Sequence, residues 1–282
     1  MAIAADLGKS IFRRTEKQLL RLASERHAEA VHGYRTTVRR LQTLLEQLVT
    51  GDGGQNKKLL KRLNRIRRAA GKVRDLDVQL EALRSLKVPQ EPRRKTQLMQ
   101  HLIDTRARHE RKLRKLLGKD DIREMQRRLR RAERALRYES GRDPLGVAKE
   151  ILGSVALPGG HADKEVLHRY RVAVKKARYA VEFAPSSAQA ATFLTGLKRL
   201  QDALGNWHDW LTLSDTAAEQ LGNVNESPLV AALHNVTQGK FRNAVAAISN
   251  HTNRSARIRE IRPLPKSAAS KTATEPDRTA AA

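Results

Sequence analysis

"HRYRVAVKKARY", residues 168–179, combines helical spacing with a high density of positive charge, and it decides the fold prediction. Apolar residues recur every three or four positions through this stretch and just beyond its two ends: Leu167, Tyr170, Val174, Ala177 and Val181. Its basic row follows one step round the helix: His168, Arg171, Lys175 and Arg178. This periodicity predicts a helix with an apolar stripe toward the core and a basic row that borders the stripe.

A second copy of this stretch begins at His32. The spacing His-x-Tyr-Arg-x3-basic-basic recurs 136 residues apart, with Tyr34, Arg35, Arg39 and Arg40 matching Tyr170, Arg171, Lys175 and Lys176. In the first copy the apolar stripe is Val31, Tyr34, Val38, Leu41, Leu45 and Leu48. Downstream, "AGKVRDLD" at 70–77 resembles "LGNWHDWL" at 204–211, which pairs Gly71 with Gly205 and Asp75 with Asp209. Two motifs in the same order predict a duplicated helical unit, with halves at 1–142 and 143–262.

The rest of the chain is predicted to form helices that are separated by Gly and Pro, because it lacks the alternating apolar and polar residues of strands. The predicted helices are 10–24, 27–49, 55–69, 75–87, 92–118, 121–138, 145–155, 163–184, 187–204, 208–221 and 228–248. Asp143 before Pro144 has the pattern of an N-cap followed by Pro at the first helical position. Residues 263–282, rich in Pro, Ser, Thr and Ala, are predicted to be a disordered tail. We therefore expect an all-α fold.

Composition points to an anionic partner. The formal net charge is +26 and the isoelectric point about 11.1, so the compact state repels itself unless an anion offsets the charge. Nucleic acid, inorganic polyphosphate and an anionic membrane surface all fit this charge. The absence of cysteine excludes disulfides, thiolate zinc sites and cysteine nucleophiles. No apolar run has the length of a membrane span and the N-terminus lacks a signal-peptide core, so we expect a soluble cytoplasmic protein without membrane insertion.

The basic rows have the chemistry of a phosphate site. Charges beside a core are costly unless they are paired, and the rows contain few carboxylates. Arg offers a planar fork that fits phosphate oxygens, Lys a compact point charge, and His a side chain whose pKa rises beside phosphate. Further basic rows extend the positive surface: Lys57, Lys61, Arg65 and Arg68; Arg108, Lys112, Lys115 and Lys119; Arg123, Arg127, Arg130, Arg134 and Arg137.

Three carboxylates, Asp75, Asp77 and Asp209, stand beside these rows. They suit either metal ligation and general-base work, or the orientation of Arg and His side chains and the capping of a helix after Gly71 and Gly205. We favour the second role. "HD" at 208–209 occurs in metal phosphohydrolases, but it is a weak signal without the other ligands. We predict no metal and no cofactor.

The chain resembles the CHAD family, the conserved histidine α-helical domain. The resemblance runs over most of residues 10–250 and rests on "HGYRTTVRRLQ", "GKVRDLDVQLEAL", "LHRYRVAVKKARYAVE" and "LKRLQDALGNWHDWLTL". It implies two antiparallel helical bundles, each a four-helix-type unit, related by a pseudo-twofold axis around a central basic surface. It also implies binding of inorganic polyphosphate and association with polyphosphate granules. Gln42 departs from the family's pattern, which often has Arg there. No Glu-x-Glu-x-Lys segment is present, so the chain resembles the stand-alone form.

The predicted function is non-catalytic binding of polyphosphate. The predicted contact residues are His32, Arg35, Arg39, Arg40, Lys57, Lys61, Arg65, Arg74, His168, Arg171, Lys175, Lys176, Arg178, Lys198 and Arg199. The residues predicted to support them are Asp75, Asp209, Tyr34, Tyr170 and Tyr179. Two alternatives remain open: RNA binding through the same surface, and phosphate chemistry with a histidine as nucleophile or base, carried out by the chain itself or as an accessory subunit.

Overall fold

The computed structural model describes residues 5–25, 27–49, 53–88, 90–136, 142–155 and 163–261. These ranges contain no strand. Their helices are α1 (Ala5–Ser24), α2 (Ala28–Thr43) with a π-helical end η1 (Leu44–Leu48), α3 (Gly53–Ser85), α4 (Pro92–Lys115), α5 (Lys119–Ala135), α6 (Pro144–Gly153), α7 (Lys164–Val181), α8 (Ala188–Leu221) and α9 (Pro228–Ile261). The predicted all-α fold is confirmed.

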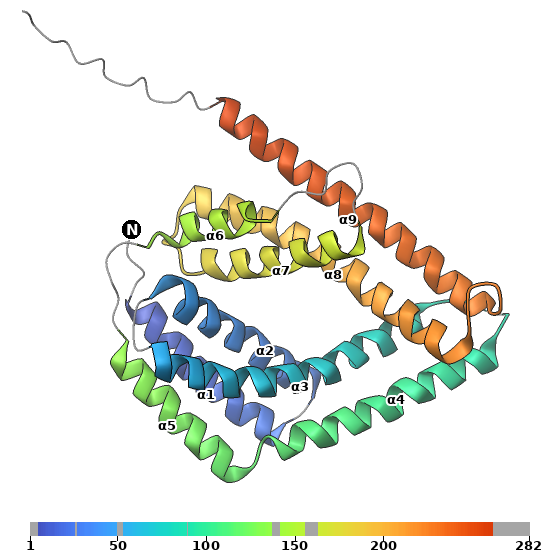
Figure 1. The fold of residues 1–282 in the computed structure, drawn as a ribbon, viewed down its shortest axis with the longest axis horizontal. Helices are drawn as coiled ribbons and strands as arrows, with labels where there is room; N and C mark the ends of the chain where they lie inside the picture. The colour runs from blue at the N-terminus through green and yellow to red at the C-terminus, as the bar shows by residue number, and fades with distance from the viewer. Residues whose placement is uncertain are drawn as a thin grey trace, which may run out of the picture.

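The duplication is visible in where the helices begin. Helix α2 begins at Ala28 and α7 at Lys164, while α4 begins at Pro92 and α9 at Pro228, so both pairs are 136 residues apart. Helices α1 to α4 thus correspond to α6 to α9 (Figure 1). The halves differ at the end: the chain turns after α4 to form α5 beside α1 and α3, whereas α9 continues as one straight helix.

Two of the predicted helix breaks were wrong. Residues 55–69 and 75–87 form the single helix α3, and residues 187–204 and 208–221 form the single helix α8. Glycine inside a helix costs about 1 kcal/mol relative to alanine, which is too little to interrupt a long helix whose neighbours pack on both sides. Here the buried Ala70, Val73, Leu204 and Trp207 hold the helix on either side of Gly71 and Gly205. Neither glycine therefore ends a helix, and the carboxylates that follow them do not cap one.

The turn between the halves follows its sequence signal. The carboxylate of Asp143 accepts hydrogen bonds from the backbone N–H groups of Leu145 and Gly146, and Pro144 occupies the first turn of α6. The predicted N-cap is confirmed, and it starts the second half one residue after the predicted boundary at 142. The predicted disordered tail, 263–282, lies outside the described residues.

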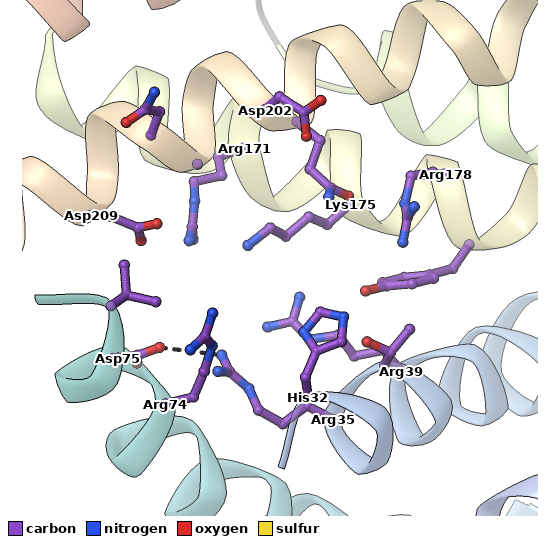
Figure 2. A pocket seen from close by; sticks show the side chains of 16 residues that line it. His32, Arg35, Arg39, Arg74, Asp75, Arg171, Lys175, Arg178, Asp202 and Asp209 are labelled. Carbon is purple, nitrogen blue, oxygen red and sulfur yellow. Dashed lines mark hydrogen bonds and ion pairs between the residues drawn. The ribbon is translucent and has the colours of Figure 1, made fainter. Parts of the chain in front are cut away.

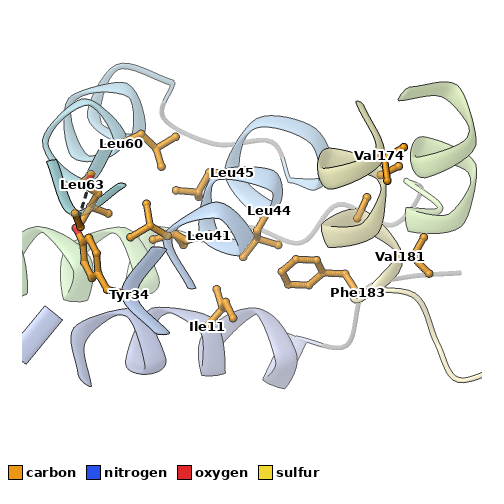
Figure 3. Packing of buried hydrophobic residues seen from close by; sticks show 14 of the residues in the cluster. Ile11, Tyr34, Leu41, Leu44, Leu45, Leu60, Leu63, Val174, Val181 and Phe183 are labelled. Atoms are coloured by element: carbon orange, nitrogen blue, oxygen red, sulfur yellow. Dashed lines mark hydrogen bonds between the residues drawn. The ribbon is translucent and has the colours of Figure 1, made fainter. Parts of the chain in front are cut away.

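Both halves contribute to one apolar core. The predicted stripes of α2 and α7 are buried, and they meet residues of α1, α3, α6 and α8 in a single cluster (Figure 3). Tyr34 is fully buried, and its hydroxyl donates to the carbonyl of Leu63 at 3.2 Å. A second, smaller cluster joins the far parts of α3, α4, α8 and α9. The predicted halves therefore share a core rather than folding around separate ones.

None of the described helices is both long and apolar enough to cross a membrane.

Candidate anion-binding site

A cavity of about 430 Å³ lies where the two halves meet, between α2 and α3 on one side and α7 and α8 on the other (Figure 2). Its basic residues are His32, Arg35, Arg39, Arg74, Arg171, Lys175 and Arg178. The other lining residues are Thr36, Asp75, Val78, Tyr179, Gln201, Asp202, Gly205, Asn206 and Asp209. Seven basic side chains and three carboxylates thus line one recess.

The α2–α3 side of the cavity contains an ion pair. A guanidinium nitrogen of Arg35 lies 3.3 Å from Oδ1 of Asp75, and the pair joins the basic row of α2 to α3. A side chain at position 71 would contact this guanidinium, since a Cβ there would lie 3.8 Å from it. Arg35 thus lies directly against α3 at position 71, at an ordinary van der Waals distance. The carboxylate of Asp75 thus orients the side chain of Arg35, which is the role that we favoured for it from the sequence.

The α7 side of the cavity has donors that find no partner in the protein. The Nε atoms of Arg171 and Arg178 are buried and make no hydrogen bond. The guanidinium of Arg178 lies 5.0 Å from the centroid of the Tyr179 ring, and a terminal nitrogen lies 3.6 Å from Glu182. An unsatisfied buried donor costs about 1–3 kcal/mol, so these groups gain from an acceptor that enters the cavity.

Burial and mutual repulsion destabilise the charged forms of the cavity cations. Burial, then the charges of Arg171 and Arg39, lowers the pKa of Lys175 to about 7. Burial is also the largest cause of the lowered pKa of Arg171 and of His32, and Arg74 adds to the effect on His32. Each shift means that burial and neighbouring cations disfavour the charged form, so an anion bound there would stabilise the charged forms and raise these pKa values.

Burial also shifts the pKa values of two consecutive residues of α8, His208 and Asp209. His208 lies beside His168, with ring centroids 5.6 Å apart, and burial followed by Arg171 lowers the pKa of His208 to about 4. Burial raises the pKa of Asp209, although Arg171 and Lys175 oppose that rise. The nearest carboxylate therefore compensates only part of the positive charge on this side.

A smaller depression of about 190 Å³ adjoins the cavity. It shares Arg39, Lys175 and Tyr179 with the cavity and adds Arg67 and Lys176. Burial, then Arg39 and Arg35, lowers the pKa of Arg67 to about 10. The basic lining is thus continuous from the cavity into this depression.

The structure brings ten of the predicted site residues together in the cavity: His32, Arg35, Arg39, Arg74, Arg171, Lys175, Arg178, Asp75, Asp209 and Tyr179. Lys176 lines the adjoining depression, and His168 lies beside His208 outside the cavity lining. The remaining residues lie elsewhere.

Four groups of predicted residues stand outside the cavity. The guanidinium of Arg40 donates to Glu182, which links α2 to the end of α7. Lys198 and Arg199 are exposed on α8. Tyr34 and Tyr170 belong to the core. A further group is exposed on the outer face of α3: Lys57, Lys61 and Arg65.

Sequence reasoning missed the contribution of α8. Gln201, Asp202 and Asn206 line the cavity, and together with Asp209 they follow one face of the helix at i, i+1, i+5 and i+8. This polar face was present in the sequence, but it lacks the basic residues that drew attention to α2 and α7. Within the described residues, no group of three or more His, Cys, Asp and Glu side chains is placed to hold a metal ion.

Comparison with known proteins identifies the family. The CHAD domain model matches residues 9–218, and no curated protein matches the chain. PptA from Streptomyces chartreusis has a similar structure, with a TM-score of 0.61 and 16% identity over 89% of this chain and 99% of that one. The CHAD domain from the plant Ricinus communis is similar too, with a TM-score of 0.61 and 18% identity over 89% of this chain and 91% of that one. At these identities the two structures show a shared fold, and the family model covers most of the chain. The chain belongs to the CHAD family.

Proposed function

We propose that this protein binds inorganic polyphosphate in the central cavity and does not cleave it. The CHAD domain is associated with polyphosphate-related proteins, which supports this ligand. The observation that carries the proposal is the state of the α7 cations: Arg171 and Lys175 have lowered pKa values, and the Nε of Arg171 has no partner. Such a site is completed by phosphate oxygens, which accept several charge-assisted hydrogen bonds.

The shape of the site favours a narrow, linear anion. The cavity is recessed between four helices, and its basic lining continues past Arg39 and Lys175 into the adjoining depression. A flexible chain of phosphates can follow this path, whereas a nucleic acid duplex is too broad for a cavity of about 430 Å³. A single small phosphate would leave part of the row unpaired.

The cavity carboxylates support binding rather than catalysis. Asp75 is held by Arg35, and Asp209 lies among cations whose charge it partly compensates. A general base needs a free carboxylate within reach of a water molecule that attacks phosphorus. We therefore propose that these side chains position and balance the cations. We also propose a cytoplasmic protein that associates with polyphosphate granules, which a fluorescent fusion in polyphosphate-rich cells would test.

Competition binding at physiological salt tests the proposed ligand. Labelled long-chain polyphosphate is bound to the purified protein and displaced with unlabelled polyphosphate, tRNA, duplex DNA or ATP. We expect displacement by polyphosphate at a concentration at least about 100-fold below that of the others, counted as phosphate, because only a thin chain fills the whole lining. Equal displacement by every polyanion would contradict a shaped phosphate site. Release of phosphate during the same incubation, lost in His168→Ala, would contradict the non-catalytic role.

A further inference from the structure

A second basic surface, outside the cavity, runs along the first half of α3. We name it the α3 stripe; it consists of Lys57, Lys58, Lys61, Arg62, Arg65, Arg68 and Lys72. All seven side chains are exposed, and none forms an ion pair within the described part of the chain. Residues 53–74 contain no Asp or Glu. No carboxylate within this segment therefore compensates the positive charge of the stripe.

The α3 stripe is continuous. At 100° per residue, its seven positions fall within about 140° of the helix circumference, and at 1.5 Å per residue they extend over roughly 22 Å. Helix α5 widens the positive surface on one side. A groove of about 470 Å³ between the two helices is lined by Lys58 together with Arg127, Arg128 and Arg131. Glu124 pairs with Arg127 and Arg128, so Arg131 remains available on that side.

The duplication shows that the fold does not need these cations. The corresponding positions of α8, 134 residues later, are Ala191, Thr192, Thr195, Gly196, Arg199, Asp202 and Asn206. They carry one cation and one carboxylate, yet α8 forms an equally long helix. The asymmetry extends to the whole halves: residues 1–142 hold 38 Lys and Arg against 17 Asp and Glu, and residues 143–262 hold 15 against 11. The first half therefore carries about +21 and the second about +4.

We propose that the α3 stripe binds double-stranded nucleic acid through the backbone phosphates, at a site separate from the central cavity. A duplex carries about one negative charge per 1.7 Å of its axis, so it matches an exposed row of this length with many phosphates at once. Residues 53–74 contain no aromatic side chain, so the stripe has nothing on which to stack the bases of a single strand. Contact with phosphates alone makes the binding independent of base sequence.

A membrane surface fits the α3 stripe less well. Binding to an anionic bilayer is normally reinforced by apolar side chains that insert between the lipids. Among the described residues, the exposed large apolar side chains are Leu20, Ile103, Val172 and Val224, and none of them lies on the stripe. The leucines of this part of α3, Leu59, Leu60 and Leu63, are buried in the core.

The test compares three full-length variants by fluorescence anisotropy with a labelled 20-base-pair duplex, at several salt concentrations. The stripe variant is Lys57→Gln/Lys61→Gln/Arg65→Gln. The matched control, Lys149→Gln/Lys164→Gln/Arg242→Gln, removes the same charge from exposed positions of the second half. Lys175→Glu alters the cavity. Circular dichroism confirms that each is folded.

We expect the stripe variant to bind the duplex about 30-fold more weakly and to flatten the slope of log K against log [salt] by about 3, while its affinity for polyphosphate changes less than about threefold. Lys175→Glu should weaken polyphosphate binding and leave duplex binding nearly unchanged. The matched control should leave both affinities nearly unchanged. An equal loss in the matched control would overturn the proposal in favour of net charge alone. An equal loss of polyphosphate binding in the stripe variant would make the stripe part of the polyphosphate site.

Two further arms of the test fix the partner. Equally tight binding of a single strand of the same length would overturn the proposal that the stripe's partner is double-stranded. So would a wild-type protein that binds vesicles of phosphatidylglycerol and phosphatidylcholine through the stripe but fails to bind the duplex. Parallel DNA and RNA duplexes, which share the backbone chemistry, then show which source the stripe prefers. Because duplex and polyphosphate affinities are measured separately, failure of this proposal leaves the proposed function of the cavity intact.

Discussion

Helices α2 and α7 present matched basic residues to one cavity, but in different electrostatic states. On α2 the leading arginine, Arg35, is paired with Asp75 at 3.3 Å, whereas the Nε of its counterpart Arg171 has no partner. At the next position of the row α2 has Arg39, and α7 has Lys175, whose pKa is lowered to about 7. At these two matched positions α2 thus has an arginine paired with a carboxylate and a second arginine, whereas α7 has an arginine with an unpaired Nε and a lysine whose pKa is lowered.

The difference assigns a distinct role to each side. On the α2 side, Arg35 already has a carboxylate partner in Asp75, so it loses little when the anion leaves. Cations with lowered pKa values and unsatisfied donors gain more from the anion, because the site without ligand opposes their charge. We therefore expect the α7 side to supply more of the binding free energy than the α2 side.

Charge reversal at the matched positions should give the largest effect. Lys175→Glu should weaken polyphosphate binding about 100-fold and Arg39→Glu about tenfold, because burial and the charges of Arg171 and Arg39 already disfavour the charged form of Lys175, which therefore gains most from the anion. Isothermal titration calorimetry at pH 6.5 measures both. Far-ultraviolet circular dichroism checks that helix content is unchanged. Equal losses would show that the two sides contribute alike.

The pH dependence of binding should reveal the titratable side. In the free protein Lys175 loses its proton above pH about 7, and the anion favours the protonated form, so binding takes up a proton above that pH. Affinity should therefore fall by up to about tenfold per unit as the pH rises from 7 to 9. The pKa values of His32 and His208 are lowered from 6.5 in the free protein, so these side chains add to the slope only at pH values below the pKa that each reaches beside the anion.

Calorimetry in buffers of different ionisation enthalpy counts the proton that is taken up. The variant Lys175→Arg keeps its charge, so it should bind with a nearly flat profile over this range. Arg39→Lys serves as the matched control at the other side. A slope that persists in Lys175→Arg would assign the proton to another group.

The stability of the free protein should change in the opposite direction to its affinity. The folded-state pKa of Lys175, about 7, lies below the ordinary value of 10.5, so the unfolded chain binds more protons between these values. The contribution of Lys175 to stability therefore rises with pH across that range and is least favourable below pH 7. Lys175→Met should raise the free energy of unfolding by about 2 kcal/mol at pH 6 and by little near pH 10, while weakening polyphosphate binding.

Urea denaturation at both pH values measures this trade-off, with Lys176→Met as a control at a neighbouring exposed position. A destabilised Lys175→Met at pH 6 would mean that the lysine is paired in the free protein. Stabilisation that is equal at pH 6 and pH 10 would trace the effect to packing instead of charge.

The all-α fold and the centre of the site could be predicted from the sequence, because both depend on the local spacing of apolar and basic residues. The apolar stripe of α7 placed that helix against the core, and the residues one step round it, Arg171 and Lys175, had to lie at its border. Features that depend on how distant segments meet were out of reach. Nothing in the sequence near Arg40 indicates that its guanidinium would donate a hydrogen bond to Glu182, 142 residues later. Likewise, Arg65 and Arg74 lie on one helix, but only the packing of α2 against α3 shows that Arg74 alone enters the cavity.

Arg40 offers the smallest and most diagnostic effect on binding. It repeats the position of Lys176 but donates to the half-buried carboxylate of Glu182, so it ties α2 to α7 rather than facing the cavity. Arg40→Gln should change polyphosphate affinity less than about threefold and lower the free energy of unfolding by about 1–2 kcal/mol, since it leaves a carboxylate without its main partner. Titration calorimetry and urea denaturation measure the two quantities.

Glu182→Gln is the matched variant. Glu182 also lies 3.6 Å from Arg178, a cavity residue, so its removal frees that cation and should tighten binding about twofold while destabilising the fold to a similar extent. The double variant should be no less stable than either single one, because the two charges are removed together. A tenfold loss of affinity in Arg40→Gln alone would instead return Arg40 to the phosphate-binding set, and α2 would then contribute a fixed charge that the ion pair with Glu182 conceals.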